Sequence, residues 1–487
     1  MEVKRTIVKS ASPRNMFTGR EKELKILEEG FRSSQSELCV IYGRRRIGKS
    51  TLLEHFVKGR PCFFYTAGKE PKRLQLKRFV RELGETTGDS LTSKVTVSEW
   101  EDALTILDRN LSVLRHGHKK VGKALVIFDE FQWMCSGGIE LISDLQRFWD
   151  KHWKRNNRID LILCGSSISF MLGEVLSQKS PLFGRRTRSF KLEPFSLKLA
   201  SKFLPGRGRY EIAEAYLAVG GVPMYLEVLR GGKSVRQALG AECFRSDGYF
   251  FDEVRFVLSE QLKETNHYFM LLSRLAQNPC QVAEMEEATG IPTGQIMFYL
   301  ERLQMLGFVS RHTPFGARIL SKTVRYRLDD YYLRFYFAFI HPRREQIVRY
   351  SSSLSFDQGA GRQWEAFTGR VFEAMARDHV DLIAHHLGHG SVLRSGSFWR
   401  KPTQRRKGVQ IDLLIECEDK TLLLCECKWG RTPIGMEVVT SLRQKAGLFP
   451  NPQHATIRLV LVMAGRATPM VQKQRDITTI GLNDFWR

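Results

Sequence analysis

The sequence predicts a multidomain α/β protein, and three features of its 487 residues carry that prediction. Near residue 45, a glycine-rich basic loop separates a short apolar run from an amphipathic one, as in a strand, a phosphate-binding turn and a helix. A second apolar run ends in two acids at positions 129 and 130. Close to the C-terminus, two alternating runs carry carboxylates and a lysine. The length exceeds that of one ordinary core, so we expect three or four domains.

The balance of charge indicates a polyanionic partner. Lysine and arginine total 76 against 52 acids, which leaves a formal net charge of +24. A surplus of this size is typical of proteins that bind nucleic acid, and we expect DNA rather than a membrane surface. No apolar run approaches the ~20 residues of a membrane span, and the nine cysteines form no CxxC pair. The sequence therefore predicts a cytoplasmic protein with reduced thiols and no membrane segment, either monomeric or a homo-oligomer.

The basic loop matches the phosphate-binding pattern G-x-x-x-x-G-K-[ST] between "LCVIY", a predicted strand, and "KSTLLEHFVKG", a predicted helix. Its glycines let backbone N–H groups turn toward phosphates, and the start of the helix adds a favourable dipole. Lys49 is expected to reach the β- and γ-phosphates of ATP, and the Ser50 hydroxyl to bind Mg²⁺. The predicted ATP-binding residues of this loop are Gly43, Arg46, Gly48, Lys49, Ser50 and Thr51.

Hydrolysis also requires a carboxylate for the metal and a group that positions water. The stretch "KALVIFDEFQWM" supplies both at the end of a buried strand: Asp129 for Mg²⁺ and Glu130 for the attacking water. The strand "IDLILCGSS" ends in Ser166, which either senses the γ-phosphate or simply ends the strand. In "PLFGRR", Arg185 or Arg186 would stabilise charge in the transition state, unless the pair forms a solvated basic turn.

Six stretches occur in the order typical of one family: "FTGREKELKILEEGF", the basic loop, "FDEFQW", "CGSS", "PLFGRR" and "VGGVPMYL". Over residues 14–335 the chain resembles archaeal-type P-loop ATPases, which belong to the AAA+ and STAND-related group. The resemblance implies that Phe17, Gly19 and Arg20 frame the nucleotide pocket. It also implies that Gly221 and Pro223 lie in a helical lid near the adenine, although Gly-Gly-x-Pro is equally typical of a helix break.

The middle of the chain predicts three helices followed by a β-hairpin. The helices are "NHYFMLLSRLAQ", "QVAEMEEATG" and "IPTGQIMFYLERLQMLGFV", and the hairpin turns around positions 314–316. This order predicts a winged helix-turn-helix. One face of the third helix buries Ile296, Leu300 and Leu303, and the other face either contacts DNA or packs on the ATPase. The residues left for a partner are Thr293, Gln295, Phe298 and Arg302.

A further domain follows the polar stretch "YSSSLSFDQGAGRQ", which we interpret as a linker. The helix "WEAFTGRVFEAMARDHV" carries Glu373, the better candidate than Glu365, and the hairpin "VQIDLLIECEDKTLLLCECKWG" carries Asp412, Glu426 and Lys428. These residues resemble the PD-(D/E)XK nuclease superfamily, although Ile411 replaces the usual proline.

The nuclease resemblance implies a restriction-endonuclease-like α/β domain in which Asp412 and Glu426 hold divalent metal ions. Glu373 would complete the catalytic set from the helix, and Lys428 would orient water. Gln444 matches a glutamine of resolvase-like members. The basic stretch "RSGSFWRKPTQRRKG", with Trp399 among its cations, would contact DNA.

The predicted architecture is therefore a P-loop AAA+-type ATPase core, a helical lid, a winged helix and a nuclease-like domain. We expect the protein to bind and hydrolyse ATP with Mg²⁺, to bind DNA, and to cleave it with the C-terminal domain. The alternative is a STAND-like nucleotide-driven switch whose winged helix and C-terminal domain only bind partners. The predicted boundaries are 14–195 for the core, 196–260 for the lid, 261–335 for the winged helix, 336–362 for a linker helix and 363–487 for the nuclease-like domain.

Overall fold

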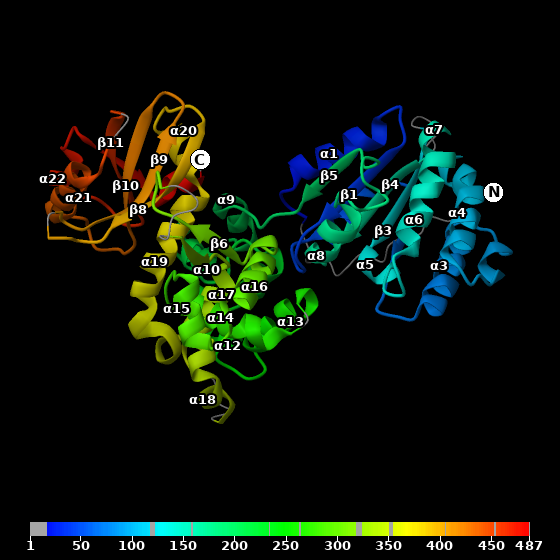
Figure 1. Ribbon diagram of the computed structural model, residues 1–487, viewed down its shortest axis with the longest axis horizontal. Helices are drawn as coiled ribbons and strands as arrows, with labels where there is room; N and C mark the ends of the chain where they lie inside the picture. The colour runs from blue at the N-terminus through cyan, green and yellow to red at the C-terminus, as the bar shows by residue number, and fades with distance from the viewer. Residues whose placement is uncertain are drawn as a thin grey trace. The chain divides into compact units, whose positions relative to one another are not determined.

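In a computed structural model the chain forms two compact units, one ending at Glu193 and the other beginning at Pro194 (Figure 1). The predicted core boundary at 195 lies close to this division. The structure describes residues 17–116, 122–156, 159–232, 234–262, 264–317, 324–349, 354–404, 406–451 and 454–486. Positions 14–16, part of the predicted wing at 318–323, and Arg405 lie outside the described residues. Across the described part, no helix combines the length and apolar character that crossing a membrane requires.

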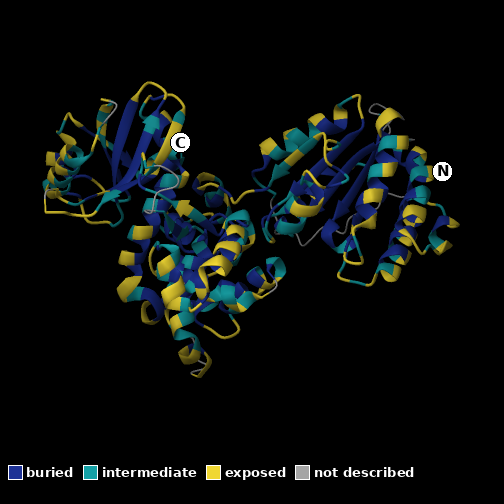
Figure 2. Cartoon of the chain, viewed as in Figure 1, coloured by how far each residue is buried: buried dark blue, intermediate teal, exposed yellow. Residues whose placement is uncertain are grey.

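The first unit is built on a parallel sheet in which the strand order is β2-β3-β4-β1-β5. The strands of this sheet are β1 (Glu37–Tyr42), β2 (Phe63–Thr66), β3 (Ala124–Asp129), β4 (Ile159–Gly165) and β5 (Arg188–Lys191). The central strands are buried along their length and are dark blue in Figure 2. Because β1, β4 and β3 are neighbours and run in the same direction, their carboxyl ends meet at one edge of the sheet.

Helices cover both faces of this sheet (Figure 1). On one face lie α1 (Glu21–Arg32) and α2 (Lys49–Phe56), and on the other lie α3 (Lys72–Thr87), α4 (Trp100–His116) and α6 (Glu140–Phe148). The second face holds a large apolar cluster. Phe79 is at its centre and contacts the rings of Phe63, Tyr65, Trp100 and Phe128 edge-on. Such parallel sheets need cover on both sides, which explains why these strands are apolar throughout.

The second unit begins with a helical part that includes the Gly-Gly-x-Pro stretch. Its main helices are α10 (Arg209–Val219), α11 (Pro223–Val228), α12 (Val235–Cys243) and α13 (Tyr249–Gln261). Gly220 ends α10 with a φ of 70°, and Pro223 opens α11. A Cβ on Gly221 would lie 1.9 Å from the backbone oxygen of Phe195. Each residue of the motif thus has a structural reason, because helix end, close backbone approach and helix start all fall within it.

Three helices and a hairpin follow, as the sequence predicts. They are α14 (Thr265–Gln277), α15 (Val282–Thr289), α16 (Thr293–Met305), β6 (Val309–His312) and β7 (Arg325–Leu328), and the two strands are antiparallel. The predicted inner face of α16 is confirmed, since Ile296, Leu300 and Leu303 are fully buried.

The stretch interpreted as a linker is helical over part of its described residues. Positions 357–361 form a helical turn, η7 (Asp357–Gly361), that runs directly into α19 (Arg362–Asp378). Trp364 is 2% exposed and contacts the rings of Phe335, Phe356 and Phe367. Its indole N–H donates to Glu214 at 2.9 Å. Within the polar stretch, Phe356 is buried against Trp364, a contact that local composition does not reveal.

The C-terminal part contains a mixed sheet in the order β12-β11-β10-β9-β8. Its strands are β8 (Val392–Arg400), β9 (Val409–Cys417), β10 (Thr421–Lys428), β11 (Thr456–Met463) and β12 (Ile477–Gly481). Strands β8, β9 and β10 are antiparallel, whereas β10, β11 and β12 are parallel. In Figure 1 the sheet lies between α19 and α20 (Val380–His386) on one side and α21 (Met436–Leu448) on the other.

The close approach at Gly221 is testable by substitution. In Gly221→Ala the added Cβ would push the backbone of Phe195 away from residue 221. We expect the substitution to lower the free energy of unfolding by ~1–3 kcal/mol. Chemical denaturation of both variants measures this. Gly369→Ala is the matched control, because Gly369 lies within α19 and the added Cβ would have no described atom within 4 Å outside the backbone of its own helix. Alanine at this helix position should raise the free energy of unfolding by ~0.5–1 kcal/mol. Equal stability of the two variants would contradict the crowding at Gly221.

Candidate functional site

The predicted phosphate loop connects β1 to α2 with the backbone geometry that such a loop needs. Gly43 follows the strand directly, and a Cβ on it would lie 2.8 Å from the backbone oxygen of Leu192. Gly48 precedes the helix with a φ of 90°, in the left-handed region that glycine tolerates. Lys49 begins the helix and its Nζ donates to the Arg44 carbonyl at 3.1 Å. The loop and the first turn of α2 therefore have the backbone geometry of an anion-binding site.

The N-terminal segment lies against this loop. Arg20 is buried, and its Nη2 donates to the Ile47 carbonyl within the loop at 3.1 Å. The ring of Phe17 stacks on His55 of α2 with centroids 3.9 Å apart. Within the loop, Arg46 adopts a φ of 68°, which is uncommon for a residue other than glycine. These contacts place two of the residues implied to frame the pocket next to the phosphate loop.

The predicted metal and water groups meet at the carboxyl ends of β3 and β1. The Ser50 hydroxyl donates to Asp129 Oδ2 at 2.7 Å, and the other Asp129 oxygen accepts the Glu130 amide at 3.0 Å. Asp129 is 1% exposed. Burial raises the pKa of Asp129, the Ser50 hydrogen bond opposes this, and nearby Glu130 adds to the rise. A divalent cation between Ser50 and Asp129 would favour the charged carboxylate, so the oxygen donors fit Mg²⁺.

Glu130 belongs to a hydrogen-bonded group with Ser166 at the end of β4. The Ser166 hydroxyl donates to Glu130 Oε2 at 2.7 Å. Gln132 contacts both partners: its side-chain amide donates to Glu130 and, at 3.0 Å, to the Ser166 hydroxyl. Sequence reasoning missed Gln132, although its place two residues after Glu130 on the same turn is a usable signal. The group fixes the Glu130 carboxylate at the sheet edge.

The remaining nucleotide-site predictions are less directly placed. Arg185 forms a two-pronged ion pair with Asp150, with its Nε 3.0 Å from both carboxylate oxygens. The structure therefore gives Arg185 a protein partner, and its role near the γ-phosphate stays a prediction. Arg186 donates to the Leu176 carbonyl at 3.4 Å. Pro223 belongs to the second unit, so its predicted place near the adenine also stays a prediction.

The second unit brings together the carboxylates predicted for metal-dependent cleavage. Cys425 pairs with Leu413 across β10 and β9, so one further step of this antiparallel register brings Glu426 opposite Asp412. The Cys427 amide donates to Asp412 Oδ2 at 3.0 Å. Glu373 approaches from α19, close enough for its carboxylate and that of Asp412 to affect each other. All three acids therefore converge at one end of the hairpin.

Two lysines hold Glu426. Lys428 Nζ lies 2.8 Å from Oε1, and Lys445 Nζ, from α21, lies 2.6 Å from Oε2. The sequence reasoning missed Lys445 and selected its neighbour Gln444, which is exposed. Residues 444 and 445 differ by about 100° around a helix, so only the packing of α21 decides which of them faces the sheet.

Crowding perturbs the acids of this site. Burial raises the pKa of Glu373 to about 7, and Asp412 adds to the rise. Burial also raises the pKa of Asp412, and Glu426 adds to it. For Lys428, burial opposes the charged form, but the hydrogen bond to Glu426 and the negative charges of the surrounding acids together outweigh it and raise the pKa. Neighbouring carboxylates raise one another's pKa because their negative charges repel. A divalent cation bound between them would reduce this repulsion.

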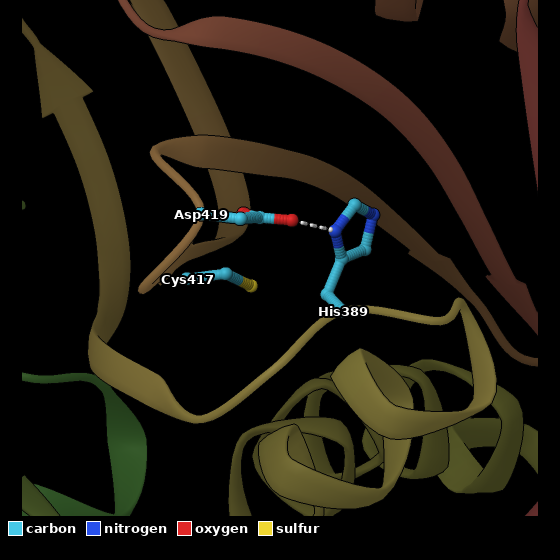
Figure 3. A group of neighbouring side chains, drawn as sticks. All are labelled: His389, Cys417 and Asp419. Carbon is cyan, nitrogen blue, oxygen red and sulfur yellow. Dashed lines mark hydrogen bonds and ion pairs between the residues drawn. The ribbon is translucent and has the colours of Figure 1, made fainter.

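A separate group on the same hairpin has a structural explanation. His389 Nδ1 contacts Asp419 Oδ2 at 2.7 Å, and the Cys417 sulfur lies beside them (Figure 3). Asp419 also accepts the Thr421 amide at 2.9 Å in the turn between β9 and β10. The hydrogen bond from His389 and that from Thr421 lower the pKa of Asp419 to about 2. This pair fastens the turn to the segment before β8, and no other role needs to be assigned to it.

Comparisons with known proteins agree with the first site. Residues 17–229 match the ATPase domain found predominantly in Archaea. An uncharacterised protein of Methanocaldococcus jannaschii is 30% identical over 416 residues, which cover 85% of this chain and 88% of the relative. The chain belongs to this archaeal-type ATPase family.

The family assignment leaves the C-terminal part open. Residues 336–439 match a second family, described as archaeal and bacterial proteins of unknown function. Among solved structures, a Walker-type ATPase of Pyrococcus abyssi is 20% identical, with a TM-score of 0.49, over 68% of this chain and 99% of that one. The ORC2 protein of Aeropyrum pernix is 17% identical, with a TM-score of 0.42, over 70% and 96% of the two chains.

The described part of the β6–β7 hairpin in this archaeal-type ATPase lies against the terminal sheet. The Phe315 amide donates to the Ser397 carbonyl at 2.8 Å, and the Arg394 guanidinium lies 4.6 Å from the Phe315 ring centre. His312 stacks on Trp399 with centroids 4.6 Å apart. Trp399, which the sequence placed among DNA-contacting cations, therefore has an aromatic partner within the protein.

The partly buried His312 should make stability depend on pH. Burial lowers its pKa to about 3, and nearby Arg327 and Arg377 contribute. Below pH 6.5 this histidine is protonated in the unfolded chain but stays neutral in the folded protein. The free energy of unfolding therefore falls as the pH decreases from 6.5 toward 3.

His312→Phe keeps the stacking on Trp399 and removes the titration. Between pH 8 and pH 5 we expect the variant to lose about 1–2 kcal/mol less free energy of unfolding than the wild type. Denaturation at both pH values measures the difference, with pH 8 as the reference for any effect of the substitution itself. Identical losses in both proteins would contradict the burial of a neutral histidine.

Proposed function

We propose that this archaeal-type ATPase hydrolyses ATP with Mg²⁺, binds DNA, and cleaves it at a metal-dependent site in its C-terminal part. The observation that carries the cleavage proposal is the convergence of Glu373, Asp412 and Glu426 with Lys428 at the end of one hairpin. The match to a family of unknown function leaves this activity to be tested.

In the first unit each group has a distinct task. The start of α2 and Lys49 would bind the phosphates of ATP, and Ser50 with Asp129 would hold Mg²⁺. Glu130, oriented by Gln132 and Ser166, would accept a proton from the attacking water or position it. Bound Mg²⁺ supplies charge neutralisation on the phosphates.

In the second unit the donors suit a hard divalent cation. Asp412 and Glu426 offer carboxylate oxygens, and Glu373 is near enough to add another. Such an ion supplies Lewis-acid stabilisation of a phosphodiester. Lys428 and Lys445 both contact the Glu426 carboxylate, and Lys428 would orient a water or a phosphate oxygen.

DNA binding is supported by charge and by the three-helix part. The element order α14, α15, α16, β6 and β7 is that of a winged helix-turn-helix. The outer face of α16 is available, with Gln295 exposed and Phe298 52% exposed. Arg302 lies over the Phe298 ring at 5.5 Å. We propose that this face of α16 contacts DNA.

One observation favours a second candidate function, a nucleotide-driven switch without cleavage. The wing packs on the terminal sheet through Phe315 and His312. A movement of either part would therefore change the position of the other. A switch of this kind needs the packing but not the carboxylates. Cleavage assays on variants of the acids therefore distinguish the two candidates.

The ATPase proposal predicts different effects for two substitutions. Lys49→Ala removes the cation that would contact the β- and γ-phosphates, and should abolish ATP binding. Glu130→Gln should leave binding within a few-fold and lower kcat by about 10²–10⁴-fold, because only the water-positioning group is lost. Equilibrium binding and phosphate release measure the two quantities, with exposed Lys58→Ala as the control. Wild-type turnover in both variants would remove the hydrolase assignment.

The nuclease proposal predicts that Asp412→Ala lowers metal-dependent nicking of DNA by about two orders of magnitude or more, since a metal ligand is lost. ATP turnover should stay close to the wild-type rate. Glu418→Ala, which removes an exposed acid from the turn of the same hairpin, is the matched control. Nicking that survives Asp412→Ala, or that is absent from the wild type with Mg²⁺ and with Mn²⁺, would instead favour the switch.

A further inference from the structure

A basic cavity of about 640 Å³ lies in the second unit beside the carboxylates. Residues of the β6–β7 hairpin, α19, β8 and β9 form its walls. Six arginines and one lysine line it, against two acids, Glu373 and Asp412. The cavity therefore connects a strongly cationic surface to the proposed cleavage site.

The positive charge of this cavity is only partly balanced within the protein. Arg327 and Arg334 share one acid, Asp329, at 2.8 Å and 3.4 Å. Arg377 contributes a third guanidinium, and its Nε is buried without a hydrogen-bond partner among the described residues. Burial lowers the pKa of Arg377 to about 10, and Arg327 and Arg334 add to the fall.

Such a concentration of guanidinium groups around a hollow favours an anion with several oxygens. Arginine presents planar donors that match phosphate, and burial strengthens each interaction because water competes less. The cations also extend from the surface inward: Arg370 and Lys401 are exposed, whereas Arg377 is only partly exposed. A linear polyanion could contact both groups in sequence and continue to Asp412.

We propose that this cavity binds the phosphodiester backbone of a single nucleic-acid strand and leads it toward the carboxylates. The inference rests on the proposed nuclease function for the fate of the strand, but not for the binding itself. The volume lies within the ~300–1,000 Å³ of ordinary ligand sites, which accommodates a few nucleotides and not a duplex. Double-stranded DNA would have to separate or end at this point.

The test measures, by fluorescence anisotropy, the binding of a labelled ten-nucleotide oligothymidylate to the full-length protein. The buffer contains EDTA and no ATP. The double variant Arg370→Ala with Lys401→Ala should weaken binding by about 10-fold. The slope of log K against log salt should decrease by about 0.7 for each phosphate that the variant no longer neutralises. Both side chains are exposed, so folding should be preserved, which circular dichroism checks. Arg458→Ala, which removes one exposed cation on β11 outside the cavity, is the control and should bind as the wild type does.

Competitors identify the ligand. Unlabelled single strand should displace the probe, whereas duplex of equal length and free AMP should displace it at least 10-fold more weakly. Wild-type affinity and salt slope in the double variant, or equal weakening in Arg458→Ala, would overturn the cavity as the binding site. Displacement by AMP as effective as that by the strand would overturn the strand as its ligand.

The same variants separate this inference from the nuclease proposal. If Asp412→Ala and the wild type both fail to cleave while Arg370→Ala with Lys401→Ala loses strand binding, the cavity stands and cleavage fails. If cleavage depends on Asp412 but the double variant binds normally, cleavage stands and the cavity inference is wrong.

Discussion

The burial of carboxyl groups on the strands of both sheets is the constraint on which the rest of this structure depends. Asp129, Asp412 and Glu426 are 1%, 7% and 3% exposed. A carboxylate removed from water is costly unless donors or cations replace the lost hydration. Each of these acids therefore requires partners from other segments of the chain, and the packing of helices and strands in each unit must bring those partners to it.

In the first unit the requirement is met mainly by neutral donors. A serine hydroxyl and a backbone amide satisfy Asp129, and a glutamine and a second serine satisfy Glu130. Neutral partners leave the net negative charge in place, so the site can still attract a cation accompanied by phosphates. The strand order makes this possible, because it brings the ends of β1, β3 and β4 together although they are far apart along the chain.

The second unit meets the same requirement with cations. Lys428 and Lys445 contact Glu426 directly, and Arg377 lies near Glu373. Part of the surplus of positive charge thus lies beside three acids. An anionic ligand and a divalent ion can be held side by side under these conditions, which a uniformly basic surface would not allow.

The sequence by itself determined the phosphate loop, the acids at the end of β3, the inner face of α16 and the alternation of the C-terminal hairpin, because all depend on neighbouring residues and local periodicity. Only the tertiary structure decided that Lys445 rather than Gln444 meets Glu426, that Gln132 joins Glu130 to Ser166, and that Arg185 pairs with Asp150. The tertiary structure also decided that Phe356, within the stretch interpreted as a linker, packs on Trp364 in a buried aromatic core. The physical reason is the same in each case: these contacts join segments distant in sequence, whose pairing depends on how helices and strands pack.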